Sequence, residues 1–171
     1  MLERKRQICY WNPEKRIVGT STVTLEAYLK LLGNVQVTEI STLDDENLAS
    51  CDLLLIAAEY IPPEDFQSWL RKLVKKVQIE DKVWIPALIF SDITFSFLGN
   101  ILHEIAETNW YFDIISARHL NSLPMRVANL FRIHDHLLEL IRYDTELQDL
   151  GKKIAVLEEE TKLLKARSNI P

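Results

Sequence analysis

The chain has 171 residues, of which 47% are hydrophobic and 26% are charged, a composition typical of a folded globular protein. Its net charge of −5 argues against nucleic-acid binding, because phosphate recognition needs a concentrated basic face. The sequence contains no apolar run of about 18 residues, as a membrane span requires, and no recognisable signal peptide. We therefore expect a cytoplasmic protein that binds neither nucleic acid nor membrane.

Apolar runs and amphipathic segments alternate along the first 130 residues. In chain order, we predict a strand at 7–11, a helix at 22–32, a strand at 35–40, a short helix at 42–49, a strand at 52–58, a helix at 62–77, a strand at 83–90, a helix at 95–108, a strand at 110–116 and a last helix with Pro124 in its first turn. The first of these helices is expected to bury Val23, Leu25, Tyr28, Leu29 and Leu32. The alternation predicts an α/β fold with a five-stranded, doubly wound parallel sheet and helices on both faces.

Polar side chains follow several of the predicted strands. Ligand sites in such sheets lie beyond the carboxyl ends of the strands, where the sequence has Asn12, Glu59, Ser91–Asp92 and Ser116–Ala117. Glu59 and Asp92 are more simply interpreted as two solvated loop acids than as a cation site. Cys9 and Cys51 lack partners at a metal-site spacing, so we interpret both as reduced thiols in or near the core. We expect neither a metal nor a cofactor.

Segments across about residues 6–133 resemble the response-regulator receiver family. Residues 52–57 resemble the third strand of that family, and Pro62 stands close to the proline that normally follows it. Residues 86–91 resemble its fourth strand, 113–117 its fifth strand and 123–130 the start of its last helix. The resemblance implies a flavodoxin-like fold and a role in bacterial two-component signal transduction.

The groups that perform phosphoryl transfer in that family are replaced in this sequence. The resemblance puts Ala57 in the place of the phosphoryl-accepting aspartate and Ala117 in that of the lysine. The acid pair that would hold Mg²⁺ is replaced by Trp11–Asn12 or by Asn12–Pro13. Only Ser91 matches. We therefore interpret residues 1–130 as a pseudo-receiver domain, a degenerate member of the family without aspartyl phosphotransfer.

The remaining segment, residues 131–168, has the heptad pattern of a coiled coil. One apolar row, at position a, contains Leu140, Leu147, Ile154, Thr161 and Ser168. The other row, at position d, contains Tyr143, Leu150, Leu157 and Leu164. Gly151 weakens the helix by about 1 kcal/mol, and Thr161 weakens the seam.

Charges beside the two rows favour a parallel homodimer over a long helix that folds back on its own domain. In a parallel pair, a residue at position g faces the partner's residue at position e five places further on. Lys153 would face Glu158, and Glu160 would face Lys165, so both pairs are opposite in charge. The predicted interface consists of Ile133, Leu140, Tyr143, Leu147, Leu150, Lys153, Ile154, Leu157, Glu158, Glu160, Thr161, Leu164 and Lys165.

His134 and His136 lie at the start of this helix. Because residues two apart point about 200° apart on a helix, the two cannot share one metal ion. We found no serine in a recognisable set with a histidine and an acid, and no phosphate-binding loop.

The sequence therefore favours a non-enzymatic signalling module. The coil would pair two pseudo-receiver domains and position or regulate an output domain, fused or separate, or another partner. We expect a partner surface at residues 97–111. A sensor for a small anion or nucleotide near Asn12, Ser91 and Arg118 is the alternative. An enzyme of flavodoxin-like build is a third hypothesis, which the absence of convergent catalytic groups disfavours.

Overall fold

The computed structural model describes residues 5–13, 21–79, 83–93 and 110–168. The chain forms two compact units, Met1–His134 and Asp135–Pro171. None of the described helices combines the length and the apolarity needed to cross a membrane.

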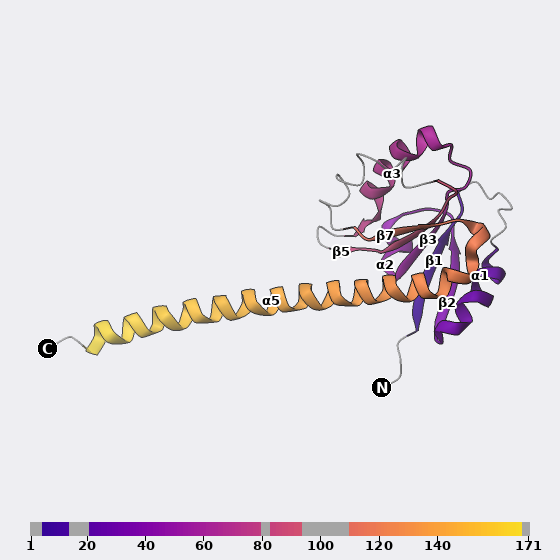
Figure 1. Ribbon diagram of the computed structural model, residues 1–171. Coiled ribbons are helices and arrows are strands. Elements are labelled where there is room, and N and C mark those ends of the chain that lie inside the picture. Colours follow the sequence, from indigo (N-terminus) through magenta and orange to yellow (C-terminus); the bar gives the residue numbers. More distant parts are fainter. Residues whose placement is uncertain (1–4, 14–20, 80–82, 94–109, 169–171) are drawn as a thin grey trace. The chain divides into compact units, whose positions relative to one another are not determined.

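A five-stranded parallel sheet is the centre of the first unit (Figure 1). Its strands are β1 (Arg6–Trp11), β2 (Val35–Ile40), β3 (Leu53–Ala57), β6 (Ala87–Phe90) and β7 (Phe112–Ile115). They lie in the order β2-β1-β3-β6-β7, and every neighbouring pair is parallel. Counted along the chain, this order is the 2-1-3-4-5 arrangement of flavodoxin-like sheets. The predicted α/β fold with a five-stranded parallel sheet is confirmed.

Strand β3 lies in the middle of the sheet because both of its faces are apolar. All five of its residues are buried, as a strand covered on two sides requires. Leu54 pairs with Cys9 of β1 on one side and with Ala87 of β6 on the other.

Helices pack against both sets of alternating strand residues. The described helices are α1 (Thr22–Leu29), α2 (Asp45–Ala49), α3 (Pro63–Val77) and α5 (Leu123–Ser168), with short 3₁₀ turns η1 (Lys30–Leu32) and η4 (Ala117–Ser122). Leu53, Leu55 and Ala57 share a cluster with side chains of α1 and the first turns of α5. Leu54 and Ile56 share the other cluster with side chains of α2 and α3.

Local sequence explains where α1 and α3 begin and what they bury. The Ser21 hydroxyl accepts a hydrogen bond from the Thr24 backbone N–H at the start of α1. After η1, Gly33 has a φ of 82°, a conformation that glycine adopts without strain. Helix α3 buries Phe66, Leu70, Leu73 and Val77, whose spacing puts them on one side of the helix.

Two predictions about local structure are wrong. Val23 is 74% exposed, although the sequence placed it on the inner side of the first helix. Residues 83–90 are not one strand: β5 (Val83–Trp84) pairs antiparallel with β4 (Gln78–Ile79) in a separate two-stranded sheet. Pro86 separates β5 from β6 because it has no N–H for a strand ladder, although its carbonyl accepts a bond from Leu54 N.

Some predictions fall on residues that the structure does not describe. The predicted helix at 95–108 lies outside the described residues. So does the predicted partner surface at 97–111, except for Trp110 and Tyr111.

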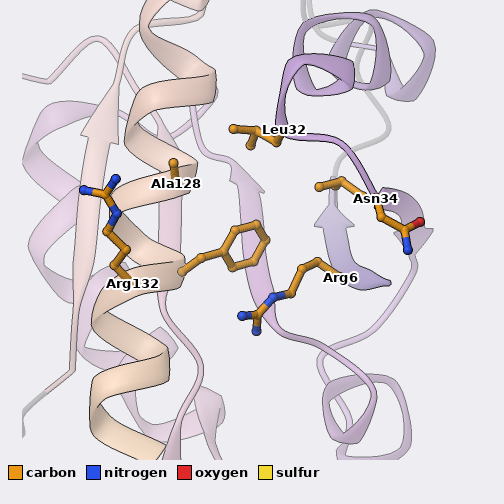
Figure 2. A pocket seen from close by; sticks show the side chains of 7 residues that line it. Arg6, Leu32, Asn34, Ala128 and Arg132 are labelled. Carbon is orange, nitrogen blue, oxygen red and sulfur yellow. The ribbon is translucent and has the colours of Figure 1, made fainter. Parts of the chain in front are cut away.

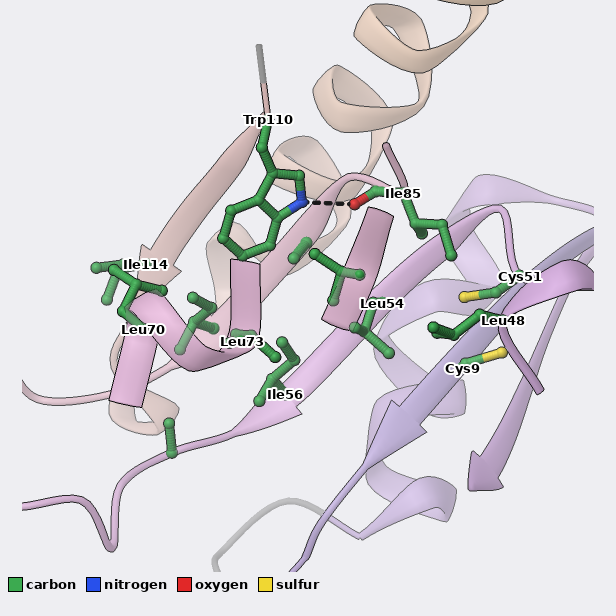
Figure 3. Close-up of a cluster of buried hydrophobic side chains, with 14 of the residues drawn as sticks. Cys9, Leu48, Cys51, Leu54, Ile56, Leu70, Leu73, Ile85, Trp110 and Ile114 are labelled. Carbon is green, nitrogen blue, oxygen red and sulfur yellow. Dashed lines mark hydrogen bonds between the residues drawn. The ribbon is translucent and has the colours of Figure 1, made fainter. Parts of the chain in front are cut away.

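Cys9, Cys51 and Trp110 belong to the cluster on the α2 and α3 side of the sheet (Figure 3). The Trp110 indole N–H donates a hydrogen bond of 2.8 Å to the Ile85 carbonyl, which satisfies its one polar atom inside the core. Both cysteines are buried free thiols. Contact with the Cys9 thiol, together with burial, raises the pKa of Cys51, so Cys51 stays protonated and behaves as a core residue.

Candidate functional site

A polar cavity lies at the carboxyl ends of β6 and β7. Its volume is about 460 Å³, and its lining residues are Ser91, Asp92, Ile93, Ile114, Ser116, Arg118 and His119. Parallel strands end at the same edge of a sheet, so residues about 25 positions apart in the sequence meet there.

Hydrogen bonds tie the polar residues of this cavity to one another. The Ser116 hydroxyl donates to Asp92 Oδ1 and accepts from the Arg118 backbone N–H. The Arg118 guanidinium lies 3.7 Å from Asp92 Oδ2, and both side chains are exposed. An exposed ion pair of this kind contributes about 0–1 kcal/mol to stability, so Asp92 does not hold the Arg118 side chain in one position. The negative charge of Asp92 also makes Arg118 a weaker ligand for an anion.

Three of the four positions that the resemblance assigns to receiver functional groups, Ser91, Ala117 and Ala57, have different environments. Ser91 is buried beside the cavity, and its hydroxyl accepts a hydrogen bond from the Ile93 backbone N–H. Ala117 is half-buried at the start of η4. Ala57 is fully buried in the same core cluster as Tyr10 and Phe90. The position that the resemblance assigns to a phosphoryl acceptor is therefore packed among apolar side chains.

The cavity only partly matches the ligand site expected from the sequence. Ser91 and Arg118 line it, but Asn12 does not. Asp92 and Ser116, which the sequence placed beyond strand ends, also line the cavity. The sequence did not assign Ile93, Ile114 or His119 to a ligand site.

Glu59 is the acid with the least favourable surroundings in the described part of the chain. Both of its carboxylate oxygens are buried and have no hydrogen-bond partner. Burial, with a smaller contribution from the negative charge of Asp92, raises the pKa of Glu59 above its usual 4.5. The folded protein therefore binds this proton more tightly than the unfolded chain does.

We predict that Glu59→Gln stabilises the protein at neutral pH by about 1 kcal/mol, because a neutral amide costs less to bury than an unsatisfied carboxylate. The pKa of Glu59 is higher in the folded protein than in the unfolded chain. The stability of the protein therefore falls as pH rises and Glu59 loses its proton in the folded state. The advantage of Glu59→Gln should therefore be smaller at pH 4 than at pH 7. Urea unfolding at the two pH values measures it. Glu26→Gln, at an exposed position on α1, is the control, and equal gains at both pH values would contradict the prediction.

A second groove, of about 590 Å³, lies in the same unit and is lined by Arg6, Leu32, Asn34, Val35, Ala128, Phe131 and Arg132. The Arg6 guanidinium stacks over the Phe131 ring at 5.2 Å from the ring centre. Figure 2 shows the guanidinium groups of Arg6 and Arg132 turned toward different sides. The two cations do not converge on one point, so this groove does not resemble a chelating anion site.

The unit Asp135–Pro171 carries the predicted dimer interface on α5. The seven apolar seam residues between 140 and 164 are each 51% to 66% exposed in the single chain: Leu140, Tyr143, Leu147, Leu150, Ile154, Leu157 and Leu164. Thr161 and the charged residues Lys153, Glu158, Glu160 and Lys165 are also exposed. Ile133 lies in the first unit and is half-buried there.

A groove runs along this exposed seam. It is lined by Ile154, Leu157, Glu158, Thr161, Lys162 and Lys165. Four of these residues occupy consecutive positions a, d, e and a, the kind of four-residue hole that receives one side chain of a facing helix in a coiled coil.

Among the described residues, no three His, Cys, Asp or Glu side chains of one chain form a group that could hold a metal ion. Searches of protein-family models, of curated proteins and of solved structures gave no match to this chain.

Proposed function

We propose that this chain is a non-enzymatic signalling module. In this proposal, a degenerate, doubly wound receiver-like domain homodimerises through a parallel coiled coil. The pairing positions or regulates an output domain or a partner protein. The observation that carries the proposal is the exposed apolar seam of α5, from Leu140 to Leu164.

The geometry of the seam supports a second copy of this chain as its occupant. The hole formed by Ile154, Leu157, Glu158 and Thr161 fits an apolar side chain from a facing helix. Lys153, Glu158 and Glu160 make no ion pair within the described part of their own chain, so they are available to the partner. In the parallel register, Lys153 meets Glu158 and Glu160 meets Lys165.

The absence of enzymatic activity is proposed from the environment of Ala57. An acceptor side chain at that position would have to replace a methyl group that is fully buried in the cluster containing Tyr10 and Phe90. Ala117 offers no cation at the position that the resemblance assigns to lysine. These two replacements support a module that acts by assembly instead of by phosphoryl transfer.

Molar mass by light scattering, over a range of concentrations, tests the proposal. We expect the full chain to be a dimer at tens of micromolar and a version that ends after Tyr143 to be a monomer. If both versions are dimers, the first unit holds the pair and the coil is secondary. A full chain that stays monomeric at tens of micromolar would contradict the proposal.

A sensor for a small anion or nucleotide is the second candidate, and the cavity beside Ser91 and Arg118 favours it. A thermal-shift screen with phosphate and nucleotides tests this candidate. Stabilisation by several degrees from one ligand class would support it, and loss of that effect in Arg118→Ala would place the ligand in this cavity.

A further inference from the structure

His136 occupies a special place in the heptad pattern of α5. It lies seven residues before Tyr143, so it is a seam residue at position d, where two copies of one residue face each other in a parallel dimer. Its side chain is 79% exposed in the single chain, so the partner can reach it. His136 meets its counterpart only in the proposed parallel homodimer, so a site that uses both copies rests on that proposed function.

Glu139 lies beside His136 on the same helix face. His136 Nδ1 is 3.7 Å from Glu139 Oε2, and the Glu139 side chain is 61% exposed. Two ligand atoms of a tetrahedral zinc ion, with bonds of about 2.0–2.1 Å, lie about 3.4 Å apart. The two donor atoms are therefore already near the separation that one zinc ion requires, and the i, i+3 spacing holds them on adjacent turns.

The charges near His136 differ from those further along the coil. Glu139 is at position g, so in the parallel dimer it faces Asp144 of the second copy, and both residues are acids. The later pairs, Lys153 with Glu158 and Glu160 with Lys165, are attractive. In the parallel dimer, the segment 136–144 thus contains four carboxylates, from Glu139 and Asp144 of both copies, and the two His136 imidazoles. A bound cation would offset the repulsion between the carboxylates.

We propose that the dimer holds one divalent transition-metal ion of the zinc class between its helices, with His136 and Glu139 of both copies as the four ligands. Two nitrogen and two oxygen donors match the four-coordinate preference of zinc. The imidazole nitrogens disfavour Mg²⁺ and Ca²⁺, which take oxygen ligands. Each chain supplies two of the four ligands, so the complete site exists only in the dimer.

Zinc binding and dimer mass, measured on the same untagged chain, test this site. Molar mass is recorded at several protein concentrations in EDTA and in ZnCl₂, and calorimetry gives the stoichiometry. We expect one zinc ion per two chains and a decrease of at least tenfold in the dimer dissociation constant. His136→Ala and Glu139→Gln should remove the zinc effect. Glu146→Gln should keep it, because Glu146 has the same heptad position but has Tyr143, not histidine, three residues before it.

The outcomes separate this site from the dimer itself. A dimer in EDTA that ignores zinc, or that responds equally in His136→Ala, overturns the metal site and leaves the dimer intact. One zinc ion bound per chain also overturns it. A chain that is monomeric in EDTA and dimeric in zinc, with the effect lost in His136→Ala, supports the site and makes the dimer metal-dependent. A monomer under both conditions overturns both proposals.

Discussion

Replacing Ile154 with aspartate is expected to convert the proposed dimer into a monomer at tens of micromolar. Ile154 is at position a in the middle of the seam, so the substitution puts two carboxylates face to face across the dimer axis. Each chain also loses an apolar contact, and a buried charge without a partner is strongly unfavourable. We expect the dissociation constant to rise at least 100-fold, which corresponds to about 3 kcal/mol. Light scattering and sedimentation equilibrium measure the change.

Val156→Asp is a matched control for this experiment. Val156 and Ile154 are both 56% exposed in the single chain, so one chain alone does not distinguish them. In the heptad, however, Val156 is at position c, away from the a/d seam. Val156→Asp should therefore keep the dimer. If the two substitutions weaken the dimer equally, the partner contacts a different face of the helix and the heptad register is wrong.

The sheet could be predicted because its strands carry a strong local signal. Residues 52–58 are apolar at almost every position, a pattern typical of a strand covered on both faces. The observed strand, Leu53–Ala57, is buried throughout. The three- and four-residue spacing of Phe66, Leu70, Leu73 and Val77 likewise predicts one side of a helix, and all four residues are buried.

The errors arose where tertiary contacts override local pattern. The apolar run at 83–90 suggests one strand, but Pro86 cannot continue a ladder and the run divides between two sheets. Val23 fits the apolar side of a helix by spacing, yet no part of the described core covers it. The sequence placed Asp92 and Ser116 beyond strand ends, and the pairing of β6 with β7 brings these residues, 24 positions apart, into one hydrogen-bonded cavity.

The position of Ala57 leads to the second large expected effect. By its resemblance to the receiver family, this is where a phosphoryl-accepting aspartate would stand. In this chain the Ala57 side chain is fully buried and shares a core cluster with Leu55, Leu88 and Phe90. A carboxylate there would lose its hydration without gaining a cation, because Ala117 takes the place that the resemblance assigns to the lysine.

We therefore predict that Ala57→Asp destabilises the first unit by about 3–5 kcal/mol at pH 7, the usual cost of an uncompensated buried charge. Burial raises the pKa of a new carboxyl in the folded state, so the loss should be smaller at pH 4, where the group is protonated, and grow as pH rises. Urea unfolding followed by circular dichroism measures both values. Intact mass after incubation with acetyl phosphate should show no phosphoryl group on this variant.

Ala57→Val separates the effect of charge from the effect of size. It adds volume without a polar atom, so it should cost about 1–3 kcal/mol, as overpacking does, with little dependence on pH. A variant Ala57→Asp that is as stable as the parent chain, or that accepts a phosphoryl group, would mean that the site retains the room and the charges of an active receiver. In that case the chain would have lost phosphoryl transfer through single replacements at an intact site. If the predicted pH-dependent loss is observed instead, the core itself has closed over the acceptor position, and restoring one aspartate cannot restore the reaction.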